Sequence, residues 1–358
     1  MIDDLRFARL LTDYCLEVSP GQQVLVESST LAAPLLLALQ REILERDAWP
    51  LIRASLPGQG EGFWHAARDR HLDGFPSSEL AEAERIDASL RIQATENANA
   101  LAGVDPARLS RAQRARSPLR EVVLARRWAI TLYPTAAAAQ QAGMGTREFT
   151  DFVTRALFLD REDPAAAWGE LRAFQAGLIE RLTPKREIHI QAEGTNLRLT
   201  VDGRVWVNSD GKRNMPSGEV FTGPHETSAE GVIRFTILTA PRGVVVEDVT
   251  LEFREGRVVS AKAERGDDYL QATLDTDEGA RYLGELGIGT NFGIDRPIGT
   301  ILFDEKIGGT VHLAVGRSYP ETGGTNDSVV HWDMICDLRQ GGTLSADGEV
   351  ILADGQFT

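Results

Sequence analysis

The strongest constraint on the fold is a change of sequence pattern near residue 183. Before this point, segments with apolar residues at helical spacing alternate with short runs rich in β-branched residues, which is typical of an α/β arrangement with a partly parallel sheet. After it, short alternating runs are separated by Asp-Gly and Glu-Gly pairs, which is typical of antiparallel strands. We therefore expect an α/β domain over residues 1–182 and a mainly antiparallel β domain of the α+β class over residues 183–358.

Individual segments follow the same division. In the first half, the pattern predicts helices over residues 5–18, 31–46, 146–158 and 165–182, and strands over residues 23–27, 88–92 and 128–132. In the second half, it predicts one helix over residues 267–283, and strands over residues 187–191, 196–201, 205–208, 232–238, 244–253 and 258–263. Hairpins are expected at Asp202-Gly203 and Glu255-Gly256, because such pairs accept the positive φ angles of tight turns.

Size and charge exclude several classes of protein. A chain of 358 residues exceeds the usual size of one domain, so two domains with sizeable cores are expected. The formal net charge of -15 argues against binding to nucleic acid or to an anionic membrane surface. No apolar run approaches the roughly 20 residues that span a bilayer. Cys15 and Cys336 form no disulfide or zinc pattern, and the acidic N-terminal residues do not resemble a secretory signal, so we expect a cytoplasmic protein.

The second half concentrates residues that can bind metal ions. His331 and Asp333 stand two positions apart in an apolar run, so a strand would place both on one face. His312 lies in a second strand-like run, Glu285 in what reads as a glycine-rich bend over residues 284–291, and Glu219 directly after a glycine. On spacing alone, a hydrogen-bonded His-Asp pair and an ordinary Gly-Glu turn remain alternatives. The other four histidines, His65, His71, His189 and His225, are expected to be structural.

The donor atoms indicate which ions would bind. Imidazole and carboxylate groups without thiolates suit zinc, cobalt, manganese or ferrous iron. Three carboxylates carry more negative charge than one divalent ion requires, whereas a carboxylate-rich set can hold two ions that share a nucleophilic water. Peptide hydrolysis is one reaction that uses such a pair.

Four segments of the second half resemble the aminopeptidase T family of metal-dependent aminopeptidases. They are NMPSGEVFTGP (214–224), GELGIGTNFGI (284–294), DEKIGGTVHLAVGRSY (304–319) and HWDMICD (331–337). The first half is similar too, in YCLEVSPGQQVLVES (14–28) and YPTAAAAQQAGM (133–144). The resemblance implies an N-terminal α/β domain, a C-terminal domain with the site, and a homodimer. It makes metal ligands of Glu219, Glu285, His312, His331 and Asp333, and it makes Tyr319 catalytic.

The resemblance also implies a mechanism. Two divalent ions, zinc or cobalt with manganese as a further candidate, would activate a water that attacks the first peptide bond of a peptide substrate. Tyr319 would stabilise the oxyanion, and Glu219 or Glu285 would carry the proton. No organic cofactor is expected. Glu305, in the segment EKIGGTVH, is either a further member of the site or the ion-pair partner of Lys306.

Two other functions stay open on the sequence. A dihydroxypyridine ring-cleaving dioxygenase of similar length shares the implied fold and uses one Fe(II) ion with two histidines and one aspartate. The short chain agrees with that alternative, and the compressed spacing between His312 and His331 indicates a trimmed loop near the site. The presence of Glu219 and Glu285 favours the peptidase. The third alternative is a dimeric binding protein without catalysis.

Overall fold

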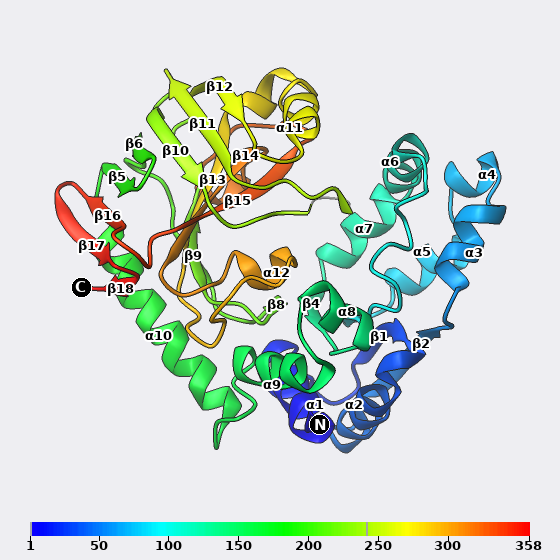
Figure 1. Ribbon diagram of the computed structural model, residues 1–358. Helices are drawn as coiled ribbons and strands as arrows, with labels where there is room; N and C mark the ends of the chain where they lie inside the picture. The colour runs from blue at the N-terminus through cyan, green and yellow to red at the C-terminus, as the bar shows by residue number, and fades with distance from the viewer. Residues whose placement is uncertain (1, 241–242) are drawn as a thin grey trace. The chain divides into compact units, whose positions relative to one another are not determined.

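A computed structural model describes residues 2–240 and 243–358 of the chain (Figure 1). The chain forms two compact units. The first unit runs to Ala165 and also includes the short later segment Gly211–Met215. The second unit consists of Ala166–Asp210 and Pro216–Thr358. Among the residues that the structure describes, no helix has the length and apolar character needed to cross a membrane.

The first unit is built on a five-stranded parallel sheet in the order β2-β1-β3-β4-β8. Its strands are β1 (Gln23–Ser29), β2 (Trp49–Ser55), β3 (Ala88–Gln93), β4 (Arg127–Leu132) and β8 (Asn214–Met215). The helices of this unit are α1 (Asp4–Arg9), a π-helix (Leu10–Cys15), α2 (Ala33–Glu45), α3 (Gln59–Ala66), α4 (Asp69–Leu72), α5 (Ser77–Ala83), α6 (Pro106–Ala115), α7 (Ser117–Leu124), α8 (Ala136–Gln141) and α9 (Thr146–Ala156). The consecutive Val24, Leu25 and Val26 are all buried, as expected of a parallel strand covered on both faces.

The second unit contains two antiparallel sheets. The larger has the order β12-β11-β10-β6-β5-β16-β17-β18, and the smaller, here called the site sheet, has the order β15-β14-β13-β9-β7. The strands of the larger sheet are β5 (Glu187–Ala192), β6 (Thr195–Thr200), β10 (Glu230–Phe235), β11 (Val249–Arg254), β12 (Arg257–Lys262), β16 (Thr343–Ala346), β17 (Glu349–Ala353) and β18 (Gln356–Phe357). Those of the site sheet are β7 (Val207–Ser209), β9 (Glu219–Thr222), β13 (Leu283–Gly289), β14 (Thr310–Gly316) and β15 (His331–Asp337).

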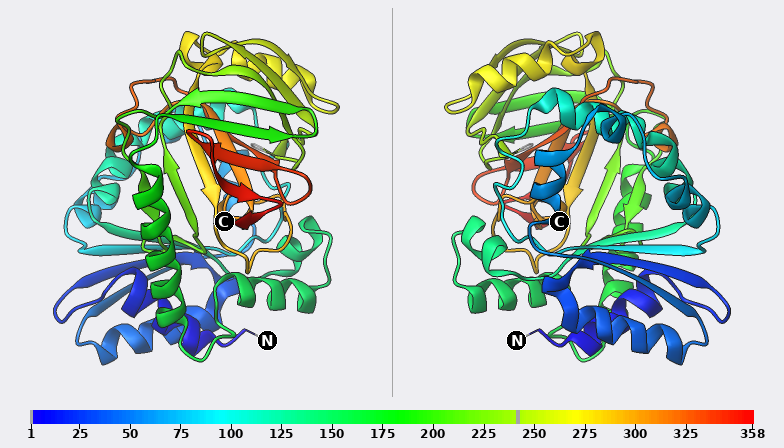
Figure 2. Two further views of the ribbon diagram at one scale, coloured as in Figure 1. Left: turned by 90° about the vertical axis from the view of Figure 1, so that its left-hand side faces the viewer. Right: turned by 90° about the vertical axis from the view of Figure 1, so that its right-hand side faces the viewer.

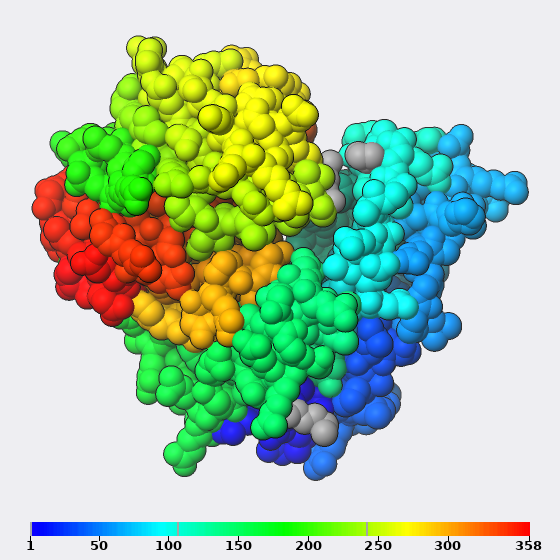
Figure 3. All heavy atoms as spheres, in the orientation of Figure 1, coloured from blue at the N-terminus to red at the C-terminus, as the bar shows by residue number. Residues whose placement is uncertain are grey.

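One long helix and several short ones complete this unit. The long helix is α10 (Pro164–Leu182), and the short ones are α11 (Asp267–Leu274), α12 (Ile301–Asp304) and two 3-10 turns (Glu278–Arg281 and Pro320–Thr322). In the space-filling view, the C-terminal residues, drawn in red, lie directly beside the green residues of β5 and β6 (Figure 3). This arrangement agrees with the pairing of β16 with β5.

The core of the second unit lies between its two sheets. Leu197 and Leu251 of the larger sheet share one cluster of buried residues with Leu286, Leu313 and Met334 of the site sheet. Because successive side chains of a strand point to opposite faces, the residues next to these three point to the other face of the site sheet. Every residue of β13 and β14 is nevertheless buried, so this second face is covered as well.

Several predicted elements need correction. The pair Asp202-Gly203 does not make a hairpin, because β6 pairs with β5 and β10 whereas β7 pairs with β9 in the other sheet. The helix predicted over residues 267–283 ends at Leu274, and the supposed glycine bend over residues 284–291 is largely strand β13. The hairpin at Glu255-Gly256 is confirmed, since these residues join β11 to β12 with φ angles of 49° and 77°.

The division between the units also differs from the expected boundary at residue 182. Most of helix α10 belongs to the second unit, and Figure 2 shows this green helix beside the strands of that unit. Leu178 and Leu182 of the helix belong to the cluster of buried residues that forms that unit's core. A sequence boundary placed after the helix ignores this packing, which only the tertiary structure shows. Five residues from later in the chain, Gly211–Met215, belong to the first unit, because their strand β8 pairs in parallel with β4.

Gln175 connects helix α10 to the site sheet. Its side chain is fully buried, and its Nε2 donates to the backbone carbonyl of Glu219 at 2.7 Å and of Ser209 at 3.3 Å. Ser209 and Glu219 are register partners of β7 and β9. Gln175 therefore fixes the backbone at the first of the predicted site residues.

We expect Gln175→Met to lower the free energy of unfolding by about 1–3 kcal/mol, because the buried carbonyl of Glu219 loses this donor. The carbonyl of Ser209 still accepts from Ser217 Oγ and Gly218 N. Denaturant titration followed by fluorescence would measure the change. Gln40→Met is the matched control, since Gln40 is an exposed glutamine of helix α2. Equal midpoints for the two variants would contradict the anchoring role of Gln175.

Candidate metal centre

The register of the site sheet brings all five predicted ligands to one face. Glu219 of β9 stands opposite Gly289 of β13, and His312 of β14 stands opposite Gly287 of β13. On the next pair of strands, Asp333 is opposite Ala314 and His331 is opposite Gly316. Because residues directly opposite one another share a face, and residues two apart do too, these positions form one continuous patch that includes Glu285.

The five side chains converge, and the nearest charged or polar atoms of neighbouring side chains are 3.3–3.5 Å apart. Nε2 of His312 lies 3.3 Å from Oε2 of Glu219 and 3.5 Å from Oε1 of Glu285. Nε2 of His331 lies 3.4 Å from Oε2 of Glu285 and 3.5 Å from Oδ2 of Asp333. The carboxylate of Glu285 therefore stands between the two imidazoles, one oxygen facing each.

Three overlapping groups of side chains could each hold an ion. The first is Glu219, Glu285 and His312, the second is Glu285, His331 and Asp333, and the third is Glu305, His312 and Asp333. Within each group the ligand atoms lie no more than 4.8 Å apart. Glu285 is common to the first two groups, as a carboxylate shared between two ions would be.

Unused buried donor atoms also point to a ligand. Oε2 of Glu219, Nε2 of His312 and Oδ1 of Asp333 are buried and form no hydrogen bond with any residue that the structure describes. Leaving such atoms unpaired is costly. A cation placed among them would satisfy all three, so the donor set fits one or more divalent ions.

The carboxylates keep both histidines protonated. Burial alone would lower the pKa of His312, but Glu285, Glu219 and Glu305 outweigh burial and raise this pKa to about 9. Asp333 and Glu285 in the same way raise the pKa of His331 to about 12 against the effect of burial. The pKa of Asp333 is about 2, because His331 overcomes the desolvation of the carboxylate. The protonated imidazoles thus supply positive charge among the acids.

A hydrogen bond at Nδ1 fixes the orientation of the His331 imidazole. Its Nδ1 lies 2.7 Å from the backbone carbonyl of Arg317, to which only a protonated ring nitrogen can donate. This contact turns Nε2 toward Glu285 and Asp333. An outer hydrogen bond of this kind is typical of metal-binding histidines.

Glycine makes room for His312. A side-chain carbon on Gly287 would lie 2.1 Å from both Cε1 and Nε2 of the imidazole. Directly before β9, Gly218 has a φ angle of +114°, and a side-chain carbon there would lie 2.7 Å from Cβ of Asn291. The glycines of these motifs therefore allow close approach, which the sequence reading mistook for a bend at residues 284–291.

Tyr319 lies at the edge of the cluster. Its hydroxyl is 3.5 Å from Nε2 of His331, and its ring packs against Phe221 at a centroid distance of 5.5 Å. Partial burial and the negative charges of Glu285 and Asp333 raise the pKa of the phenol above its usual range. Tyr319 therefore keeps its proton, while 39% of the residue is accessible to solvent.

Lys306 is the residue that the sequence reading did not assign to the site. Its side chain is fully buried, and its Nζ donates to Oε1 of Glu219 at 2.7 Å and also to Glu305. In sequence it follows two acids, and it is expected only as an ion-pair partner of Glu305. Its burial follows from the tertiary structure, because the segment after α12 returns to the residues that follow β13, where Asn291 N donates to Lys306 O.

The remaining histidines lie apart from the cluster. His189 contacts Asn196, and His225 contacts the carbonyl of Asp202. Nδ1 of His71 accepts from the backbone N–H of Arg68, where it caps α4. Among the described residues, the groups that could hold a metal contain only His312 and His331 of the six histidines.

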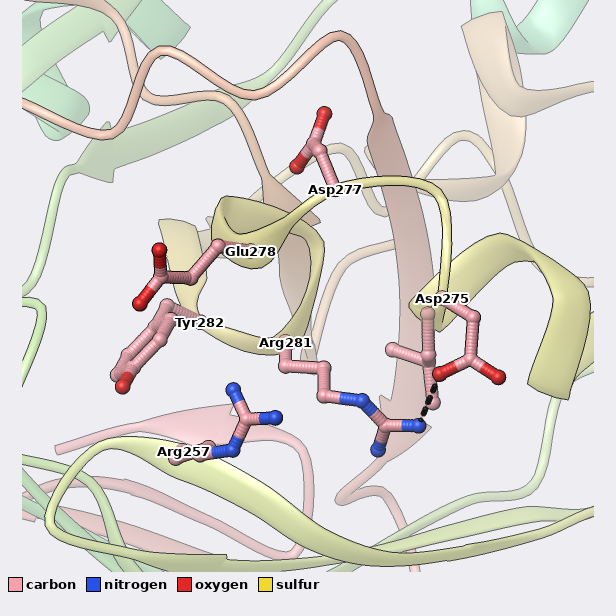
Figure 4. Close-up of a pocket in the computed structure, with 7 residues that line it drawn as sticks. Arg257, Asp275, Asp277, Glu278, Arg281 and Tyr282 are labelled. Carbon is pink, nitrogen blue, oxygen red and sulfur yellow. Dashed lines mark hydrogen bonds and ion pairs between the residues drawn. The ribbon is translucent and has the colours of Figure 1, made fainter.

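A separate hollow in the second unit does not resemble a catalytic site. It has a volume of about 470 Å³ and lies beside the 3-10 turn, with Arg257, Glu278 and Tyr282 around it (Figure 4). Arg281 is paired with Asp275 at 2.6 Å, and Asp277 accepts from Ser328 at 2.7 Å. Its charged groups are therefore mainly engaged in holding the surrounding loops.

Comparison with solved structures shows which fold this is. The structure matches that of AmpT from Thermus thermophilus with a TM-score of 0.85 and 24% sequence identity, over 99% of both chains. It also matches a 2,5-dihydroxypyridine dioxygenase from Pseudomonas putida KT2440 with a TM-score of 0.58 and 16% identity, over 99% of this chain and 96% of that one. Both likenesses concern the fold alone, and they confirm a mixed α/β architecture with parallel and antiparallel sheets.

Sequence comparison identifies the family. The chain is 30% identical to aminopeptidase 2 from Geobacillus stearothermophilus across an alignment of 408 residues that covers 98% of this chain and 97% of the relative. It is 31% identical to aminopeptidase T from Thermus aquaticus over 330 residues, 80% of this chain and 79% of the relative. The resemblance to aminopeptidase T is thus confirmed. Since residues 4–357 match the thermophilic metalloprotease (M29) family, the chain belongs to that family.

Proposed function

We propose that this protein is a metal-dependent aminopeptidase that removes N-terminal residues from peptides at the centre formed by Glu219, Glu285, His312, His331 and Asp333. The observation that carries the proposal is the convergence of these side chains in two groups that share Glu285. Membership of a metalloprotease family and the aminopeptidases among the relatives support the reaction class.

The donor chemistry favours two divalent ions. Two imidazoles and at least three carboxylates, without a thiolate, suit zinc or cobalt, and manganese as well. Ions bound there would supply Lewis acidity and a water of lowered pKa. The glutamates also distinguish this set from the two histidines and one aspartate of a single-iron oxygenase, because Glu219 and Glu285 lie in direct contact with His312.

The side chains around the centre can perform the remaining steps. Tyr319 retains its proton and can donate a hydrogen bond to the oxyanion that develops on the scissile carbonyl. Glu219 or Glu285 can accept a proton from the attacking water and return it to the leaving amine. The excess of carboxylates attracts the ammonium group of a free peptide N-terminus, which favours removal of terminal residues.

The assembly and the location of the protein are also proposals. We propose a homodimer, which the aminopeptidase T resemblance implies. A cytoplasmic location agrees with the buried cysteines Cys15 and Cys336, which form no disulfide, since reduced thiols persist in that compartment.

The protein is expected to hydrolyse aminoacyl amides or dipeptides after loading with cobalt or zinc, and to lose this activity in the presence of a chelator. Metal analysis of the loaded protein should give two ions per chain. One ion per chain, together with oxygen uptake when ferrous iron and a dihydroxypyridine are supplied, would instead support the dioxygenase. No chelator-sensitive hydrolysis of any substrate in the panel would overturn the proposal.

Tyr319→Phe is expected to lower kcat by roughly 10²–10³-fold with little change in KM, because the hydroxyl acts on the oxyanion and not on the bound substrate. Steady-state kinetics on one aminoacyl substrate would measure both constants. Tyr282→Phe removes a hydroxyl from the separate hollow and should leave both unchanged. A Tyr319→Phe variant with the kcat of the unaltered protein would rule out this role.

Metal binding is expected to release protons. With a pKa of about 9, His312 is protonated at pH 7, and so is His331 with a pKa of about 12, whereas an ion binds only the neutral imidazole. The affinity for the ions should therefore fall as the pH is lowered from 8 to 6. In the metal-free protein, the ion pairs of His312 stabilise the fold below pH 6.5 and are lost as the pH rises through about 9.

Calorimetric titration with zinc in two buffers of different ionisation enthalpy would count the released protons. The same binding enthalpy in both buffers would mean that no proton leaves, and would contradict the protonated state of these histidines.

A further inference from the structure

The complete burial of the Lys306 side chain calls for an explanation. The sequence contains four lysines among its 38 basic residues, the others being arginines. The side chain of Lys306 is 0% exposed, and a buried ammonium is costly unless it is paired and hydrogen-bonded. Its partners are two carboxylates, Glu219 and Glu305.

The contacts of Lys306 determine how Glu219 faces the centre. The ammonium takes Oε1 of Glu219 at 2.7 Å. The other oxygen, Oε2, accepts no hydrogen bond from any described residue and lies 3.3 Å from Nε2 of His312. Lys306 thus fixes one carboxylate oxygen of Glu219 by a hydrogen bond, and the other oxygen faces the cluster without a hydrogen bond.

Glu305 is held by the same nitrogen. Lys306 donates to its Oε1, and Glu305 belongs with His312 and Asp333 to the third group that could hold a metal. One atom therefore links a carboxylate of the first group to a carboxylate of the third. A lysine suits this task, because all three of its N–H donors radiate from one atom, whereas the planar fork of an arginine needs more space.

We propose that Lys306 is a positioning residue that orients Glu219 and Glu305, so that each directs one oxygen to the metal centre. This role rests on the proposed metal-dependent function. Lys306 touches neither the substrate nor the reacting atoms. Without its ammonium, Glu219 is free to rotate and to offer both oxygens, and the two carboxylates of the pair lose the cation between them.

The test compares the wild-type protein with Lys306→Met, which removes the charge and keeps most of the volume. With cobalt bound, the visible absorption spectrum reports the number and arrangement of ligands without requiring turnover. We expect an altered cobalt spectrum and a kcat lowered about 10–100-fold at saturating cobalt, with KM within about threefold of the wild-type value.

The control is Glu42→Gln in the first unit. Glu42 is a buried acid that pairs with Arg9 and Arg46, so this variant also breaks a buried ion pair. It should lower the unfolding temperature and leave the cobalt spectrum unchanged. A Lys306→Met variant whose spectrum and kcat equal those of the wild type would show that Lys306 serves stability alone, and would overturn the inference.

A second comparison covers the case in which Lys306→Met does not fold. The double variant Lys306→Met/Glu305→Gln removes one negative charge together with the ammonium, and its reference is Glu305→Gln alone. Glu219 remains unrestrained in the double variant, so its cobalt spectrum should differ from that of Glu305→Gln; identical spectra overturn the inference.

The two proposals can fail separately. A wild-type protein that binds cobalt without hydrolysing any substrate contradicts the proposed function, while the spectra still test Lys306. An active wild type, together with a Lys306→Met variant that has the same cobalt spectrum and the same kcat, contradicts the inference alone. A wild type that binds no cobalt contradicts both.

Discussion

The structure of the second unit depends on the neutralisation of acids that are buried together. Glu219, Glu285, Glu305 and Asp333 converge on one covered face of the site sheet, where carboxylates cannot remain charged without nearby cations. The cations in the structure are Lys306, His312 and His331. Two of these three, the histidines, can release their proton to solvent when a metal ion binds. The groups that balance the buried charge are therefore the same ones that would bind the proposed ions.

The sequence allowed the ligands to be predicted where strand alternation was visible. His331 and Asp333 share a face because they are two residues apart in a strand, as their spacing indicated. The structure brings Glu285 together with the other predicted ligands, but it places this residue on a strand and not in a bend. Three glycines in seven residues predict a bend, yet β13 needs them because a carbonyl or an imidazole lies where each side chain would be.

Other features could not have been predicted from local pattern. The separation of β6 from β7 into different sheets depends on which strands pair over long range, and the turn at Asp202-Gly203 looks the same in either case. The burial of Lys306 likewise depends on three segments that meet only in the folded chain. Residues near Glu219, Asn291 and Lys306 are joined by backbone hydrogen bonds from Thr290 to Gly218 and from Asn291 to Lys306.

The fold itself does not determine the reaction. The same architecture occurs in an aminopeptidase and, with a lower TM-score, in a dioxygenase, so the chemistry must be inferred from the side chains on the site sheet. Here the glutamates on β9 and β13 are present together with the two histidines and the aspartate. That full set, and not the arrangement of strands, separates the two possibilities.

The two hydrogen bonds that Gln175 donates have a consequence for how force passes along the chain. The chain leaves the second unit after Asp210, contributes β8 to the sheet of the first unit, and returns at Pro216, only three residues before Glu219. Gln175 binds the carbonyls of Ser209 and Glu219, one on each side of this excursion. A force on β8 is therefore expected to act first on the hydrogen bonds that close the base of this excursion, and to reach the side chain of Glu219 only after they break.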